Sequence, residues 1–176
     1  MTLLRPPNAD ELIDEDAFDE DEFLPYWAEL WTSGVALARV VPSLDVAGRR
    51  VLELGAGLGL PSLTAALCGA DVLATDWAEE AVSLLRANAR RNSIRLRVKR
   101  VRWDSAESLV RAAPWDLVLC ADVLYEQRNA EQLLLLLPRL GGEVVLADPG
   151  RPFAKGFLAQ WVVETLDDGV YRLRLP

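Results

Sequence analysis

The sequence predicts an α/β fold in which a seven-stranded sheet carries helices on both faces. Short apolar segments alternate five times with segments of helical periodicity, and the fourth and fifth of them (residues 115–122 and 142–150) are almost wholly apolar. Apolar strands of this kind are typical of a parallel sheet that is covered on both faces. Two further short segments (residues 161–166 and 170–175) flank Asp167-Asp168-Gly169, a turn sequence that predicts a C-terminal antiparallel hairpin.

The elements follow in order along the chain. Residues 25–44 have the apolar spacing of a helix that is broken or capped near Thr32, Ser33 and Gly34. Parallel strands are expected at residues 49–55, 71–76, 94–101, 115–122 and 142–150, and helices at residues 59–69, 78–92, 105–113, 130–140 and 152–160. Acidic residues begin the helix at 78–92 and arginines end it, as the helix dipole favours.

Composition excludes several classes of chemistry. The chain has 176 residues, 51% of them hydrophobic, which suits one domain with a substantial core. It has two cysteines and no histidine, so a zinc cluster, a Cys/His nucleophile and a Ser/His/Asp triad are not expected. No signal peptide or membrane-spanning segment is evident in the sequence. We therefore expect a soluble cytoplasmic protein without a metal or a membrane partner.

The net charge of −8 is unevenly distributed. Residues 1–24 are expected to form an acidic leader, partly disordered because its carboxylates repel one another, ahead of a single domain at 25–176. The opposite bias fills residues 84–103, where arginines and a lysine occur without an acid. This run suits either an acidic or nucleic-acid partner or a strand with one charged side that discourages aggregation. We favour the second interpretation, and no nucleic-acid partner is expected for so acidic a chain.

A glycine-rich loop follows the first strand. Gly55, Gly57 and Gly59 have the spacing GxGxG, and Leu60 stands where the dinucleotide fingerprint GxGxxG has glycine. Asp76 ends the second strand 21 residues after Gly55, close to the offset at which a carboxylate meets ribose hydroxyls. The combination predicts a cofactor that contains adenosine; the alternative is a plain tight turn followed by a solvated acid.

Neighbouring residues indicate which adenosine cofactor fits. Glu53 lies two residues before the first glycine, where a carboxylate is unfavourable beside a pyrophosphate but acceptable beside a cation. S-adenosylmethionine is cationic and has no phosphate. Trp103 and Asp104 follow the third strand, where an indole ring can pack on adenine and a carboxylate can accept from its amino group. Trp103 suits an ordinary core position equally well.

Five segments together resemble a known family. PYWAELWTSGVALA, VLELGAGLGLPSL, ATDW, VRWD and CADVLYE occur in this order between about Pro25 and Gly150. They resemble the seven-strand, Rossmann-like S-adenosylmethionine-dependent methyltransferases, specifically the protein-lysine methyltransferases of family 16. Similar sequences include the methyltransferases of the electron transfer flavoprotein beta subunit and bacterial proteins described as nicotinamide N-methyltransferases.

The resemblance implies a function and a set of site residues. It implies transfer of a methyl group from S-adenosylmethionine, with S-adenosylhomocysteine as product, to a lysine of a protein substrate. The residues expected to contact the cofactor, including those argued above, are Trp31, Glu53, Gly55, Ala56, Gly57, Asp76, Trp77, Trp103, Asp104 and Ala121. Asp122 and Tyr125, which match the ends of the family's D-x-x-Y signature, are implied to line the channel for the lysine.

Physical chemistry agrees with a role for Asp122, which closes the fourth strand at the edge where ligands bind in open α/β sheets. A helix cap or loop anchor is the structural alternative for such an acid. Because a carboxylate favours a protonated amine, we expect Asp122 to capture and orient the acceptor rather than to act as a general base. A small-molecule N-methyltransferase with a nicotinamide-like acceptor, a dinucleotide-dependent oxidoreductase and a non-catalytic cofactor-binding module remain as alternatives.

Overall fold

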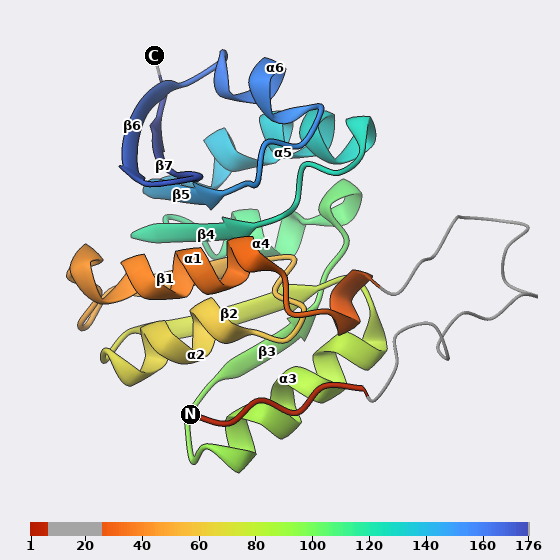
Figure 1. Cartoon of the computed structure of the whole chain (residues 1–176), viewed down its shortest axis with the longest axis vertical. Helices are drawn as coiled ribbons and strands as arrows, with labels where there is room; N and C mark the ends of the chain where they lie inside the picture. Colours follow the sequence, from red (N-terminus) through yellow and green to blue (C-terminus); the bar gives the residue numbers. More distant parts are fainter. Residues whose placement is uncertain (7–25, 176) are drawn as a thin grey trace, which may run out of the picture.

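A computed structural model describes residues 1–6 and 26–175, and in it one seven-stranded sheet runs through the molecule (Figure 1). The strand order is β3-β2-β1-β4-β5-β7-β6. The strands are β1 (Arg50–Leu54), β2 (Asp71–Asp76), β3 (Arg97–Arg100), β4 (Leu117–Ala121), β5 (Glu143–Ala147), β6 (Val162–Asp167) and β7 (Val170–Arg174). The first five are parallel, and β7 pairs antiparallel with both β5 and β6, which confirms the predicted fold.

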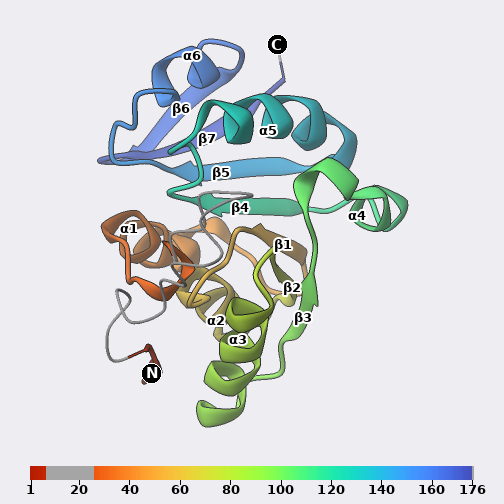
Figure 2. The same cartoon turned by 90° about the vertical axis from the view of Figure 1, so that its right-hand side faces the viewer.

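Helices cover both faces of the sheet (Figure 2). The helical elements are η3 (Tyr26–Ala28), α1 (Thr32–Val40), η4 (Val41–Leu44), α2 (Leu60–Leu67), α3 (Glu79–Arg91), η5 (Trp103–Ser105), α4 (Glu107–Arg111), α5 (Gln127–Leu140) and α6 (Ala154–Leu158). Side chains of α1 and α2 pack on one face of the sheet, whereas those of α4, α5 and α6 pack on the other. Within the described ranges, no helix combines the length and the apolar character that a membrane crossing requires.

The two faces of β4 show why its sequence is apolar throughout. Leu117 and Leu119 pack with α1 and α2, while Val118 and Cys120 pack with α5, and all four side chains are fully buried. By contrast β3, at the edge of the sheet, is mostly exposed, as its run of charged residues predicted. Arg97 on this strand forms an ion pair with Asp71 at 3.0 Å.

The strand order places the chemistry at one edge of the sheet. β1 lies between β2 and β4, and Leu54, its last residue, is level with Thr75 on one side and Cys120 on the other. The chain therefore leaves β1, β2 and β4 at adjacent points. In open α/β sheets this reversal of strand order at the carboxyl ends is the place where ligands bind.

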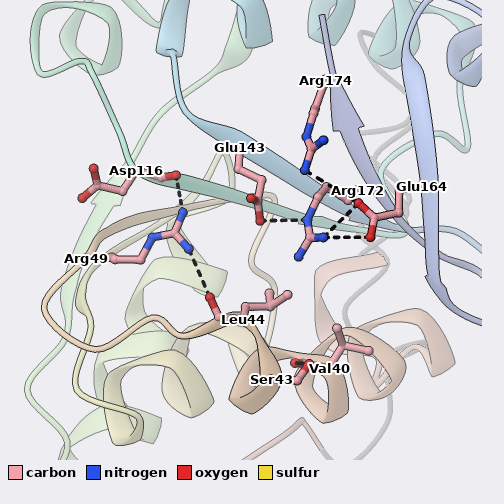
Figure 3. A network of polar contacts seen from close by, with 9 residues as sticks. All are labelled: Val40, Ser43, Leu44, Arg49, Asp116, Glu143, Glu164, Arg172 and Arg174. Carbon is pink, nitrogen blue, oxygen red and sulfur yellow. Dashed lines mark hydrogen bonds and ion pairs between the residues drawn. The ribbon is translucent and has the colours of Figure 1, made fainter.

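The opposite part of the sheet is held by polar contacts (Figure 3). Arg172 of β7 forms ion pairs with Glu143 of β5 at 3.1 Å and with Glu164 of β6 at 2.9 Å, so one side chain joins three strands. Arg49 donates to the carbonyls of Leu44 (3.1 Å) and Asp116 (2.7 Å), which joins η4 to the start of β4.

Several boundaries differ from the predicted ones, and two of the differences have a clear physical cause. The helix predicted at residues 130–140 begins at Gln127, because the polar residues before Ala130 form its first turn and Asn129 is buried there. The strand predicted at 94–101 is shorter, since the Ile94 amide still donates to the Ala89 carbonyl of α3 at 2.9 Å.

The predicted acidic leader lies mostly outside the described residues, including its whole acidic cluster. Its first six residues are described, and two of them pair with α3. Asn88 accepts from the Leu4 amide at 2.6 Å and donates to the Leu4 carbonyl at 3.1 Å. Asn92 makes the same two bonds to Thr2, each 2.8 Å long. No pattern in the sequence indicates this attachment.

Candidate active site

A cavity of about 390 Å³ opens at the carboxyl ends of β1, β2 and β4. This volume lies in the range of small-molecule sites. Every site residue predicted from the sequence lines it: Trp31, Glu53, Gly55, Ala56, Gly57, Asp76, Trp77, Trp103, Asp104, Ala121, Asp122 and Tyr125. The fold thus brings together residues from α1, β1, β2, η5 and β4.

The glycine loop packs closely against its neighbours, so a side chain at Gly55 or Gly57 would be crowded. Gly55 has a φ of +65°, and a Cβ there would lie 3.3 Å from the Trp103 ring and 3.1 Å from Val123. Gly57 has a φ of +50°, and a Cβ there would lie 3.1 Å from the Trp27 carbonyl oxygen. Glycine is needed at both positions, since few other residues adopt positive φ readily.

Asp76 ties this loop to β2. Its Oδ2 accepts from the Gly57 amide at 2.9 Å and its Oδ1 from the Ala78 amide at 3.1 Å. Burial of the carboxyl raises its pKa, and these backbone hydrogen bonds oppose the increase. Because the Gly57 amide already has an acceptor, it does not face the cavity as a phosphate donor. This geometry argues against the dinucleotide alternative.

Glu53 brings a second acid to the same loop. It is 1% exposed, and its Oε2 accepts from the Ser62 amide at 2.9 Å. Burial is the main cause that raises the pKa of Glu53 to about 8, with Asp76 adding a smaller repulsion. A buried acid of this kind suits a cationic ligand, which stabilises its ionised form, and opposes a phosphate.

Aromatic rings form another wall of the cavity. Trp103 lies against the glycine loop and also packs on the core beneath α5, so it is a partly buried core residue that also lines the cavity. Asp104 is exposed, and its carboxylate pairs with Arg102 at 3.1 Å and accepts from Ser105 at 3.0 Å. The Arg102 hydrogen bond lowers the pKa of Asp104.

Asp122 lines the same cavity directly after β4, and it has an unusual backbone conformation. Its φ is +57°, a region that few residues other than glycine adopt and in which asparagine and aspartate are enriched. Its Oδ1 accepts from the Nε of Arg151 at 2.7 Å, and the Ser33 hydroxyl approaches its Oδ2 at 3.4 Å. Unusual backbone geometry of this kind is common at functional sites.

Tyr125 completes the acceptor side of the cavity. Its ring packs on that of Tyr26, with the centroids 5.0 Å apart, and burial raises the pKa of its phenol. It is therefore a neutral hydrogen-bonding group and a wall of the cavity at neutral pH.

The residues that were not predicted include Tyr26 and Arg151, which line the cavity, and Ser33, which approaches Asp122. Arg151 lies 5.4 Å from the Trp31 ring centre, which places its guanidinium over an aromatic face. The rule that ligands bind beyond the carboxyl ends of strands, applied to β5 as well as β4, would have singled out Arg151. Tyr26 and Ser33 gave no such sequence signal.

Comparison with known proteins assigns a family. Residues 18–146 match the family model described as "Lysine methyltransferase". Protein N-lysine methyltransferase METTL21A of Danio rerio is 38% identical over 128 residues, 68% of this chain and 58% of that protein. The electron transfer flavoprotein beta subunit lysine methyltransferase of Xenopus laevis is 36% identical over 137 residues, covering 72% and 53%. The chain thus spans little more than half the length of these relatives.

Solved structures agree on the fold. The magnesium protoporphyrin IX methyltransferase of Synechocystis with bound SAM has a TM-score of 0.60 and 18% identity, covering 97% of both chains. The ribosomal protein L11 methylase of Lactobacillus delbrueckii subsp. bulgaricus has a TM-score of 0.61 and 20% identity, covering 82% of this chain and 78% of its own. With the fold, the cavity and a family match over most of its length, the chain belongs to the lysine methyltransferase family.

Proposed function

We propose that the chain is an S-adenosylmethionine-dependent N-methyltransferase that acts on a lysine side chain of a protein substrate. One observation carries the proposal: Asp122 and Tyr125 line the same cavity as the glycine loop and Asp76. A donor site and an acceptor site within one cavity are what a direct transfer between two bound molecules requires.

The residues of the cavity fit S-adenosylmethionine. Asp76, at the end of β2, is placed to accept from ribose hydroxyls, and Trp103 offers an aromatic face for adenine. Glu53 suits a cationic group, and Gly55 and Gly57 line the cavity without a side chain. When bound, this cofactor supplies a methyl group that is already activated by a sulfonium.

On the acceptor side, the protein must hold an amine in line with the methyl group. A lysine has a free pKa of about 10.4, so it has to lose a proton before its lone pair can attack. The amine then forms the new nitrogen–carbon bond while the carbon–sulfur bond breaks, with its electron pair remaining on sulfur and the displaced proton passing to water. Asp122 accepts a hydrogen bond from the amine and orients it, and Tyr125 limits its movement. No residue is assigned as a general base.

The family supports a protein acceptor. The relatives compared above are named as methyltransferases of protein lysines, and METTL23 of Xenopus laevis, 36% identical over 62% of this chain and 50% of its own, is named a histone-arginine methyltransferase. A side-chain nitrogen of a protein is the acceptor that these names have in common.

Labelled methyl transfer tests the proposal. The purified chain is incubated with methyl-labelled S-adenosylmethionine and a bacterial extract, and labelled proteins are digested and analysed by mass spectrometry. We expect label on lysine, and on the order of a hundredfold less of it with the Asp122→Asn variant. Transfer to added nicotinamide but to no protein would instead support the small-molecule alternative. Calorimetry should show binding of S-adenosylhomocysteine and none of NAD.

A further inference from the structure

Asp122, the proposed acceptor carboxylate, is not a bare charge. The Nε of Arg151 donates to its Oδ1 at 2.7 Å, and the two form an ion pair inside the cavity. The Asp122 side chain is 3% exposed, whereas that of Arg151 is 32% exposed. Arg151 therefore pairs with a buried carboxylate while its own side chain remains partly in contact with solvent.

The loop after β5 is built to place this arginine. Asp148, which is 2% exposed, accepts at one oxygen from the amides of Gly150 (2.8 Å) and Arg151 (2.7 Å). These hydrogen bonds hold the backbone of Arg151 in place and so determine where its side chain begins. The ring of Trp31 then supports the guanidinium from below, at 5.4 Å. Asp148, just after β5, and Trp31, just before α1, thus both hold Arg151 in place.

The electrostatic consequence concerns the acceptor amine. A buried carboxylate alone stabilises a neighbouring ammonium, and an ammonium has no lone pair with which to attack. A guanidinium that is hydrogen-bonded to the same carboxylate repels the ammonium and leaves the neutral amine unaffected. Asp122 still has lone pairs that can accept a hydrogen bond from the amine, because Arg151 donates to only one of the two carboxylate oxygens.

We propose that Arg151 is a positioning residue that screens Asp122, so that the acceptor amine is held as a neutral hydrogen-bond donor instead of being trapped as an ammonium ion. This role rests on the proposed function, and it adds Arg151, which was not predicted from the sequence, to the residues of the acceptor site. Lysine would be a poor substitute, since its ammonium lacks the planar fork that allows pairing and stacking together.

Other titratable groups face this pair and have to be considered. Asp148 lies behind it on the same loop, and burial raises the pKa of that carboxyl. Tyr26 faces Arg151 from η3, and Tyr125 faces the cavity from the segment after β4. The hydrogen bond to Asp122 raises the pKa of Arg151 further, so the guanidinium stays charged at every pH at which the protein would work.

A binding experiment without methyl transfer tests the screening. The probe is n-butylammonium, titrated at pH 8 into the protein saturated with S-adenosylhomocysteine. We expect Arg151→Gln to bind the probe at least about tenfold more tightly than the parent, because the exposed carboxylate then faces a cation alone. Adding Asp122→Asn to Arg151→Gln should abolish the gain.

A matched control separates this effect from general charge. Arg128 lines the same cavity and pairs with Glu126, and within the described residues no ion pair joins it to Asp122. Arg128→Gln removes the same charge and should change the affinity for the probe by less than about twofold. Thermal unfolding verifies that each variant folds, and Arg151→Met provides a second replacement. Equal affinity of the parent and both Arg151 variants, or an equal gain with Arg128→Gln, would overturn the proposal.

The pH profile of methyl transfer is the second readout. With saturating cofactor, Arg151→Gln should shift the rise of the rate toward higher pH by about one unit, with only partial rescue by Arg151→Lys. An unshifted profile contradicts the screening role. If the parent methylates nothing in the extract, the proposed function fails, while the n-butylammonium titration still decides whether Arg151 screens Asp122.

Discussion

The Oδ2 atom of Asp76 accepts a hydrogen bond from the backbone amide of Gly57 at 2.9 Å. The acid that was expected to bind the ribose thus also holds the glycine loop in place. A carboxylate oxygen has more than one lone pair, so a single side chain can serve both the loop and a ligand. Its two roles can be separated by measuring stability and binding on the same variants.

Replacement of Asp76 should therefore affect both properties. We expect Asp76→Ala to weaken binding of S-adenosylhomocysteine by about 1.5 to 3 kcal/mol, since charge-assisted hydrogen bonds are lost. Asp76→Asn, which keeps one acceptor oxygen, should fall between the parent and the alanine variant. Calorimetry measures the affinity, and thermal unfolding without ligand measures the loop's contribution. Parental affinity in Asp76→Ala would show that the ribose is bound elsewhere.

Glu53 should make the stability of the ligand-free protein depend on pH. Its pKa is raised from 4.5 to about 8, so between these values the folded state holds a proton that the unfolded state has lost. The contribution of protonated Glu53 to the free energy of unfolding is therefore fully present below about pH 4.5. It is lost as the pH rises through 8, by up to about 1.4 kcal/mol per pH unit.

The variant Glu53→Gln isolates this effect, because an amide oxygen can still accept from Ser62 and does not titrate in this range. We expect the free energies of unfolding of parent and variant, measured from pH 5 to 9, to diverge as the pH rises, with the variant the more stable at pH 9. Parallel curves would mean that Glu53 titrates normally.

Asn88 connects the beginning of the chain to the glycine loop. Besides its two bonds to Leu4, it donates to the Leu58 carbonyl at 3.2 Å, and it is fully buried. Asn88→Ala should lower the free energy of unfolding by about 2 to 3 kcal/mol, because buried polar groups lose their partners. It should also weaken binding of S-adenosylhomocysteine.

The neighbouring asparagine provides the control for this variant. Asn92 pairs with Thr2 at an exposed position and makes no bond to the loop in the described structure. Asn92→Ala should cost less than about 1 kcal/mol and leave the affinity unchanged. Equal effects of the two variants would refute a specific link between Asn88 and the loop.

The periodicity of apolar residues was sufficient to predict the strands of the sheet, but it was not sufficient to predict where a helix with a polar first turn begins. The strands β4 and β5 were predictable because both of their faces are buried, which leaves nearly every residue apolar. The start of α5 was missed, since its first turn is polar and so lies outside the apolar periodicity that marks the rest of the helix.

The same distinction holds for the site. Gly55, Asp76 and Asp122 were predictable because each follows a buried strand, where the fold class already places ligands. Arg151 pairs with a residue 29 positions away, and Ser33 approaches one 89 positions away. Only the folded arrangement of α1, β4 and β5 reveals that these side chains meet.

Asp122 provides the decisive test of the acceptor site. Asp122→Asn keeps the side-chain shape and tolerates the φ of +57°, whereas Asp122→Ala adds backbone strain of about 1 kcal/mol or more. We expect both variants to bind S-adenosylhomocysteine as the parent does, because Asp76, Trp103 and the glycine loop are unchanged. Methyl transfer to extract proteins should fall on the order of a hundredfold, since a misplaced amine no longer lies in line with the methyl group.

The comparison has to be made at equal cofactor saturation, because a weakened cofactor site would otherwise imitate a catalytic defect. Initial rates are measured at several extract dilutions, with thermal unfolding as a check on folding. Transfer by Asp122→Asn at the parental rate would remove Asp122 from the acceptor site. The alternative of a small-molecule acceptor, bound by other residues of the cavity, would then be the better supported function.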